Sequence, residues 1–264
     1  MLTIIVCMKQ VIDPEAPVSL FKVDVEAKRA VPPVGTPPVL NPFDENALEA
    51  ALRVKDTREA KVTVLSMGRN LAKPVINKSL AAGADELILL EDDAFRDFDS
   101  YSTAYILVQA IKRLGEYDLI LCGRQAADTD AGQVGSGIAA ILEIPSITVA
   151  RRVEVNNGGV RVERVVSDGY EVVETKMPVL ITASNEVGEL RYPGIKDMIA
   201  AQKKPTTVWN ARDLEIDLSP IKHNNLLRLF IPVRPEYKCQ LMEGETRAKA
   251  AANLALELRK AGII

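Results

Sequence analysis

The sequence predicts an α/β protein with a mostly parallel, doubly wound sheet, a β-rich insertion and an extended C-terminal arm. Through the first two-thirds of the chain, short apolar runs alternate with segments of helical periodicity, the pattern of a parallel sheet covered by helices on both faces. The run at 2–8 is apolar without interruption, as in a strand buried on both sides. Beyond about residue 205 the periodicity weakens, and a segment of that kind is poorly suited to form its own core.

The helix predicted at 41–56 carries the clearest end signals. Asn41 can cap it, Pro42 suits the first helical position, and Asp44 adds an acid to the first turn. Gly83 and Gly115 end the next two helices. In chain order, the sequence predicts a strand at 2–8, a helix at 41–56, a strand at 61–68, a helix at 70–84, a strand at 86–90, a helix at 100–115, a strand at 117–123 and a helix at 133–142.

From about residue 147 the pattern becomes β-rich. A hairpin with an Asn157–Gly158 turn is followed by two further β-rich runs up to residue 183. A last helix is predicted at 246–260. We therefore expect an α/β domain at 1–204, with its β-rich part at about 147–183, and a C-terminal arm at 205–264 that packs on its own domain or on a partner chain.

Composition limits the classes of function. The chain has 264 residues, 47% hydrophobic and 26% charged, with a net charge of −3, which argues against a general nucleic-acid-binding protein. No apolar run approaches the roughly 20 residues that cross a bilayer, and Lys9 ends the N-terminal apolar run without a basic region before it. Cys7, Cys122 and Cys239 are far apart in sequence, so we expect neither a disulfide framework nor a metal site. These features favour a cytoplasmic protein.

Ligands of such sheets bind beyond the carboxyl ends of the strands. The loops after Met8, Ser66 and Cys122 meet that condition. The third loop leads into the helix at 133–142, and the backbone amides of Gln133 to Gly137 can bind a phosphate without a lysine. The alternative is that the two acids of this loop, Asp128 and Asp130, only shape a turn and cap the helix.

Sequence patterns of several known sites are weak or missing. Gly135 and Gly137 match a dinucleotide fingerprint, but about a dozen residues separate them from their strand, and no Walker loop occurs. The single histidine, His223, has no nucleophile or ligand set near it in sequence. Without a serine–histidine–acid set, an HExxH motif or paired catalytic carboxylates, we expect no acid–base catalytic residues.

Three segments resemble one family. They are "IIVCMKQVID" at the N-terminus, "NPFDENALEAALRVKD" at 41–56, and "VERVVSDGYEVVETKMPVLITA" at 162–183. Over nearly its whole length the chain resembles the β subunit of electron transfer flavoproteins. In the third segment Glu171 and Pro178 match the family signature, while Ser167 stands where an acid is usual.

The resemblance implies an adenine-nucleotide-binding, Rossmann-like domain in a heterodimer. The partner α subunit would carry an electron-transferring FAD, and the arm at 205–264 would wrap around it. A second nucleotide would lie in this chain, and the resemblance assigns its site to Cys7, Lys9, Asn41, Pro42, Phe43, Asp44, Met67, Gly68, Gly123, Asp128, Thr129, Asp130, Ala131, Gly132, Gln133, Val134, Gly135, Ser136 and Gly137.

The resemblance leaves two nucleotides open. Ordinary members hold a structural AMP, whereas electron-bifurcating members hold a second FAD. The run Gln133-Val134-Gly135 resembles the bifurcating type, Asp128-Thr129-Asp130 is intermediate, and Ser136 replaces the proline usual there. FAD is therefore favoured, with NADH as electron donor and ferredoxin as a candidate low-potential acceptor; an electron shuttle with AMP is the alternative.

Residues 184–204 resemble the family's recognition loop for acyl-CoA dehydrogenases. Val187 aligns with its usual leucine, and Leu190 is the alternative anchor. A stress-type ATP-binding protein is the competing class. It would leave the arm at 205–264 unexplained, and the SGGxDS loop of the related ATP pyrophosphatases is missing.

Overall fold

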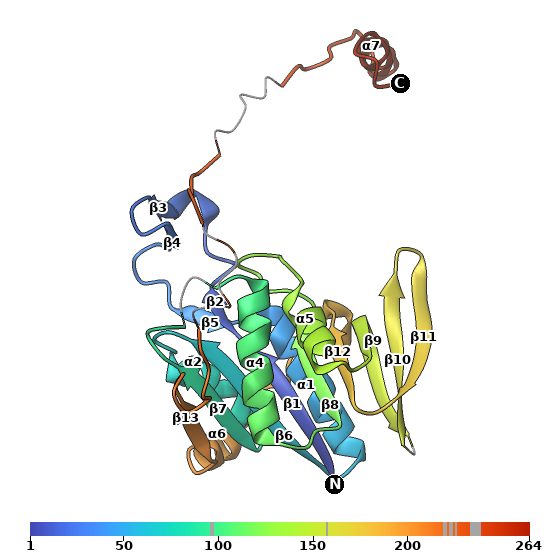
Figure 1. Ribbon diagram of the computed structural model, residues 1–264. Coiled ribbons are helices and arrows are strands. Elements are labelled where there is room, and N and C mark those ends of the chain that lie inside the picture. Colours follow the sequence, from blue (N-terminus) through green and yellow to red (C-terminus); the bar gives the residue numbers. More distant parts are fainter. Residues whose placement is uncertain (96–97, 157, 219–220, 222–223, 225, 233–238) are drawn as a thin grey trace. The chain divides into compact units, whose positions relative to one another are not determined.

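The computed structural model describes residues 1–95, 98–156, 158–218, 221, 224, 226–232 and 239–264 (Figure 1). They divide into two compact units, Met1–Arg228 and Leu229–Ile264. His223 lies outside the described residues.

A sheet of nine strands forms the centre of the first unit, in the order β11-β10-β9-β12-β8-β1-β6-β7-β13. Neighbouring strands are parallel from β9 through β12 to β13, while β10 is antiparallel to both β9 and β11. This confirms the predicted mostly parallel α/β sheet. The strands are β1 (Leu2–Met8), β6 (Ala60–Gly68), β7 (Glu86–Glu91), β8 (Leu119–Gly123), β9 (Ser146–Asn156), β10 (Gly159–Val166), β11 (Gly169–Lys176), β12 (Val179–Ala183) and β13 (Thr206–Trp209).

Helices cover the sheet on both faces. In β1, Ile4 and Val6 belong to one buried cluster, whereas Ile5 and Cys7 belong to another, because side chains alternate along a strand. Figure 1 shows α4 and α5 over the near face, with α1 behind the strands. One cluster contains α1 (Pro42–Thr57), α2 (Lys73–Ile76), α3 (Lys78–Ala82) and the end of α6 (Ile195–Ala201); the other contains α4 (Ser100–Leu114) and α5 (Val134–Leu142).

The helix predicted at 70–84 is two short helices instead. Asn70 has a left-handed backbone, with φ of 56°. The amides of Leu71 and Ala72 then bond the side chains of Glu91 and Gln10 at 3.0 and 2.7 Å. These long-range bonds delay the helix to Lys73, and Asn77 separates α2 from α3.

The segment after residue 205 begins inside the first unit. β13 pairs in parallel with β7, with Thr206 opposite Leu87, and Leu214 and Ile221 are buried beside α4 and α5. The compact units divide at Arg228, later than the boundary expected at 204. A four-residue strand at a sheet edge leaves almost no periodicity in the sequence, so only its pairing reveals it.

The β-rich part is continuous with the central sheet. β9 and β10 form the predicted hairpin, with Asn156 opposite Gly159. Asn157 of the predicted turn lies outside the described residues, while Gly158 has φ of 89°. The remaining elements of this unit are β2 (Gln10–Ile12) paired with β5 (Pro38–Leu40), β3 (Lys22–Asp24) paired with β4 (Arg29–Val31), and the short helices η1 (Val18–Leu20) and η2 (Asn185–Val187).

The second unit contains one helix, α7 (Arg247–Lys260), among its described residues. In α7, all of which the structure describes, no side chain is buried. Within the described residues, no helix is long and apolar enough to cross a membrane, and no group of His, Cys, Asp and Glu could hold a metal ion.

Candidate functional site

A cavity of about 380 Å³ lies at the carboxyl ends of β1, β6 and β8, beside the first turns of α4 and α5. This is where a parallel α/β sheet binds its ligands, and the volume is within the range of small-molecule sites. Many residues assigned by resemblance line it: Cys7, Lys9, Asn41, Asp44, Met67, Gly68, Gly123, Thr129, Ala131, Gly132, Gln133, Val134 and Gly135.

The other assigned residues lie around this cavity without lining it. Pro42 and Phe43 begin α1, and the ring of Phe43 faces the guanidinium of Arg124 at 4.7 Å. Ser136 is exposed, and Gly137 lies against Ala104 of α4. The remaining two, Asp128 and Asp130, bond other parts of the protein.

Sequence reasoning missed the contribution of α4. The loop after β7 is also a strand end in this sheet, so the same argument applied to it would have pointed to the first turn of α4. The cavity-lining residues that were not anticipated are Met8, Leu65, Phe95, Phe98, Asp99, Ser100, Thr103, Leu107, Cys122, Arg124, Gln125 and Ala126.

Asn41 stands at the N-cap of α1, but its side chain makes no capping bond. Its amide nitrogen donates to the carbonyl of Gln125 at 2.8 Å, and its amide oxygen accepts from the backbone of Ala127 at 3.0 Å. Asn41 thus stands at the predicted N-cap position, but it makes no capping bond because the tertiary fold directs its amide to the loop after β8. Asn41 fixes that loop to the start of α1.

Asp44 joins two strand ends at the cavity. Its carboxyl group accepts from the backbone amides of Lys9 at 2.8 Å and Gly123 at 3.0 Å. Burial raises the pKa of Asp44 to about 7, against the opposing effect of these bonds and of Asn41. Gly123 is required here, since a Cβ would lie 2.5 Å from Asp44 Oδ1.

The two loop acids have partners within the protein. Asp128 forms an ion pair with Lys9, at 2.7 Å, and so joins the loop to the end of β1. Asp130 has φ of 51° and accepts from the side chain of Gln125 at 2.7 Å. They therefore shape the loop, as one reading of the sequence expected, but neither caps α5.

The first turn of α5 is free to bind an anion. The first backbone amides of a helix have no intrahelical acceptor, and a capping side chain often supplies one. In α5 the N-cap residue Gln133 makes no such bond, which leaves these amides available to an anion. Gly135 allows the turn to lie close to β12, because a Cβ would come within 2.7 Å of Thr182 Cγ2. Gly132, with φ of 62°, turns the chain into the helix. Glycines, backbone amides and an uncapped helix terminus suit a nucleotide phosphate.

Two buried thiols complete the floor of the cavity. Cys7 and Cys122 are opposite each other on β1 and β8, and both are free. A hydrogen bond with Cys7 and burial hold the pKa of Cys122 well above its usual range. Because both thiols are buried and free, they pack as small apolar residues.

Of the two expected partner anchors, Val187 is buried and Leu190 is half-buried. Val187 is 4% exposed and packs in the core on the α1 side of the sheet, and Leu190 packs against the same cluster. Other side chains of the segment 184–204 are exposed, among them Tyr192 at 91% and Ile195 at 74%. No pattern in the sequence distinguishes the buried Val187 from the exposed Ile195, because both side chains are apolar.

Comparison with known proteins bears on the family. Residues 34–214 match the model of the electron transfer flavoprotein domain. The chain belongs to the electron transfer flavoprotein family. It is 47% identical over 184 residues to the electron transfer flavoprotein subunit beta of Thermoanaerobacterium thermosaccharolyticum, an alignment that covers 69% of this chain and 70% of that one.

Two further relatives align over nearly the whole chain. The caffeyl-CoA reductase-Etf complex subunit CarD of Acetobacterium woodii is 36% identical and covers 99% of both chains. Protein FixA of Azorhizobium caulinodans is 32% identical, covering 96% of this chain and 92% of its own. This electron transfer flavoprotein chain is thus of the β-subunit and FixA type, with a role in electron transfer beside an α subunit.

Proposed function

We propose that this chain is the β subunit of an electron-bifurcating electron transfer flavoprotein and that the cavity at the strand ends binds FAD. The alternative is a structural AMP in the same place, which would make the heterodimer an ordinary electron shuttle. Both share an adenine nucleotide whose phosphate lies at the first turn of α5.

The cavity itself carries the proposal. It combines an uncapped helix terminus with two glycines in its lining, Gly123 and Gly135, which let the strand-end loop and the first turn of α5 pack closely against Asp44 and Thr182. Such a site binds phosphate through backbone donors. The sequence Gln133-Val134-Gly135, which resembles the bifurcating type, favours FAD over AMP. The full-length similarity to a subunit of a caffeyl-CoA reductase-Etf complex supports an electron-transfer role within a larger complex.

The residues of this chain would bind and orient the nucleotide. The amides at Val134 and Gly135 would donate to the phosphate, while Asn41 and the Lys9–Asp128 pair hold the loop after β8 to the start of α1 and to the end of β1. Cys7 and Met67 supply apolar contact. The chemistry that a bound FAD would supply is reduction by hydride from NADH followed by transfer of single electrons. One electron would go to the α-subunit flavin and the other to a low-potential carrier such as ferredoxin.

Nucleotide content tests this proposal. The chain is co-purified with its α subunit, the complex is denatured, and FAD and AMP are quantified by chromatography. Two FAD and no AMP per heterodimer support bifurcation, whereas one FAD with one AMP supports the shuttle. Lys112→Ala, on the exposed end of α4, is the control for Asn41→Ala, which we expect to lower the content of the second nucleotide alone.

We also propose that the segment 184–204 docks an acyl-CoA dehydrogenase or a similar flavoenzyme, through side chains other than those first expected. Val187 is buried, so Val187→Asp would disturb the core instead of the docking surface. The exposed apolar side chains of this segment are Tyr192, Ile195, Met198 and Ile199, which we call the docking patch.

Ile195→Asp tests the docking patch. Electron transfer from a purified acyl-CoA dehydrogenase that reduces the wild-type complex should need a higher dehydrogenase concentration, with flavin content unchanged. Lys196→Gln, beside it on α6, lowers the net charge by the same one unit and so controls for a change of charge alone. Unchanged transfer in Ile195→Asp would refute this role.

The C-terminal unit is proposed to pack on the α subunit. In α7, which the structure describes throughout, no side chain is buried, and the apolar side chains of Leu254 and Leu256 are exposed. Paired aspartate substitutions at these positions should prevent co-purification with the α subunit. A stable heterodimer from that variant would argue for a different role of α7.

A further inference from the structure

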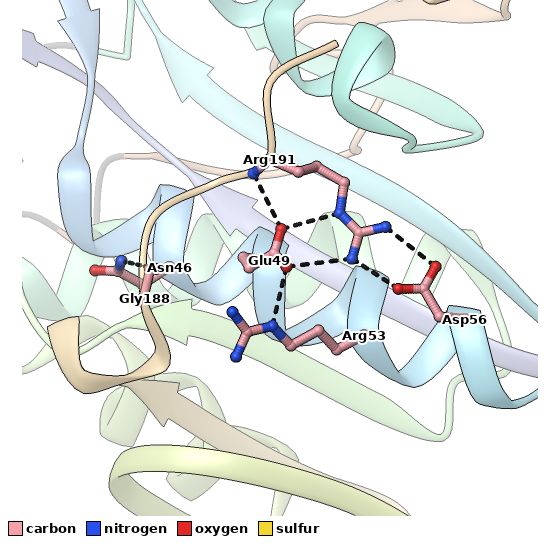
Figure 2. A network of polar contacts seen from close by, with 6 residues as sticks. All are labelled: Asn46, Glu49, Arg53, Asp56, Gly188 and Arg191. Carbon is pink, nitrogen blue, oxygen red and sulfur yellow. Dashed lines mark hydrogen bonds and ion pairs between the residues drawn. The ribbon is translucent and has the colours of Figure 1, made fainter.

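A network of polar contacts attaches the residues before the docking patch to α1 (Figure 2). Arg191 donates to Glu49 from its backbone amide at 3.1 Å and from Nε at 3.0 Å. The same guanidinium reaches Asp56, with the shorter bond at 2.8 Å. Asn46 donates to the carbonyl of Gly188 at 2.6 Å. Both ends of the tetrapeptide 188–191 are therefore tied to one side of α1.

Glu49 is the centre of this network. It is buried, and Arg53 donates to it as well, at 2.9 Å. Burial would raise the pKa of Glu49, but the bonds from Arg191 and Arg53 outweigh burial and hold it below its usual range. Bonds to Asp56 and Glu49 in turn raise the pKa of Arg191. A charged, multiply bonded contact of this kind is directional, unlike apolar packing, and so sets the orientation of the chain at Arg191.

The chain just after Arg191 has little packing behind it. A cavity of about 270 Å³ lies between α3 and this segment, lined in part by Arg191, Tyr192 and Pro193. Firm attachment resumes only at the far end of α6, where Ala201 is buried and Lys204 donates to the carbonyls of Leu80 and Ala84 at 2.8 and 2.6 Å. The docking patch is thus attached to the rest of the fold at its two ends, and Arg191 makes the first of these attachments.

We propose that Arg191 is the positioning residue of the docking patch: through Glu49 and Asp56 it fixes the angle at which Tyr192 and Ile195 are presented to an acyl-CoA dehydrogenase. This inference rests on the docking function proposed above. It assigns to Arg191 no contact with the partner; the guanidinium faces α1.

Arg191→Gln in the complex with the α subunit tests the inference. Hydrogen exchange of the amides at 192–201 should accelerate about tenfold, and the KM for the dehydrogenase should rise by about the same factor, with kcat and flavin content unchanged. Arg191→Lys, which can bond only one of the two acids well, should restore part of both effects. Unchanged exchange at 192–201 would overturn the inference.

Two further variants keep the test decisive. Asp56→Asn removes only the exposed partner of Arg191 and leaves folding intact. It should still raise the exchange rate at 192–201 and the KM for the dehydrogenase, by a smaller factor than Arg191→Gln. Arg29→Gln breaks an exposed pair with Asp24 elsewhere and should change neither. If Ile195→Asp raises the KM while Arg191→Gln and Asp56→Asn do not, the positioning role is wrong. If Ile195→Asp has no effect, the docking function fails, and exchange at 192–201 still decides whether Arg191 orders the segment.

Discussion

Helix α1 serves two regions of this protein with different chemistry. At its start, Asn41 and Asp44 bond backbone groups of the strand-end loops around the nucleotide cavity. Further along, Glu49 and Asp56 bond one arginine side chain that leads into the docking patch. At the cavity, Asn41 and Asp44 each bond two backbone groups, whereas next to the docking patch the contact with Glu49 and Asp56 is made by the one residue Arg191. We therefore expect the cavity to tolerate substitution in its loop better than the docking segment tolerates loss of Arg191.

The largest effect should come from pH acting on Asp44. Its pKa is raised from 3.8 to about 7 in the folded protein. The stability that this group contributes is present below its unfolded pKa and is lost as pH rises through its folded pKa, up to roughly 4 kcal/mol. The wild-type protein should therefore lose unfolding free energy between pH 4 and 8, and Asp44→Asn should lack the part of this loss that is due to Asp44. The measurement is the unfolding free energy of both proteins as a function of pH. Parallel pH profiles would show that Asp44 is ionised throughout.

Gly123→Ala should be next. The added Cβ would lie 2.5 Å from Asp44 Oδ1 and 2.6 Å from the backbone carbonyl carbon of Phe43, so the start of α1 has to move. We expect a loss of about 3 kcal/mol together with loss of the bound nucleotide. Denaturant unfolding and nucleotide analysis measure both, with Lys112→Ala, on the exposed end of α4, as the control. Retention of nucleotide at wild-type levels would mean that the cavity can adapt.

Asn41→Ala should have a moderate effect. It removes the bonds to Gln125 and Ala127, leaving a partly buried carbonyl and amide without these partners, at about 2 kcal/mol. Because the loop over the cavity is released, added nucleotide should raise the melting temperature of the variant less than that of the wild type. An equal rise of the melting temperature in the variant and the wild type would show that nucleotide binding does not depend on the attachment of this loop by Asn41.

The smallest effect is expected from a matched pair on the other side of the comparison. Glu49→Gln should cost about 1.5 kcal/mol, since a buried partner of two arginines is lost, and Asp56→Asn only about 0.5 kcal/mol because that acid is exposed. Added salt should weaken the contribution of Asp56 and leave that of Glu49. Equal losses of unfolding free energy in Glu49→Gln and Asp56→Asn would show that the burial of Glu49 does not strengthen its contribution relative to that of Asp56.

Much of the fold followed from local pattern. The strand at 2–8 and the helices near 41–56 and 100–115 agree with the structure to within one or two residues, because continuous apolar runs and helical spacing are properties of neighbouring residues. The cavity also lies where alternating strands and helices place it. The helix at 70–84 failed because Glu91 and Gln10 take up the amides at its expected start, and no local pattern contains those partners.

By itself, then, the sequence determined the α/β class, the strand ends at which a ligand binds, and the resemblance that led to the family. Only the tertiary structure decided that Asn41 holds a loop 84 residues away, that Val187 is buried while Ile195 is exposed, and that Arg191 bonds Glu49 across 142 residues. Periodicity reports the environment of a residue averaged over its own helix or strand. The partner of a polar side chain, and which of two equally apolar residues is covered, depend on elements that meet only when the chain has folded.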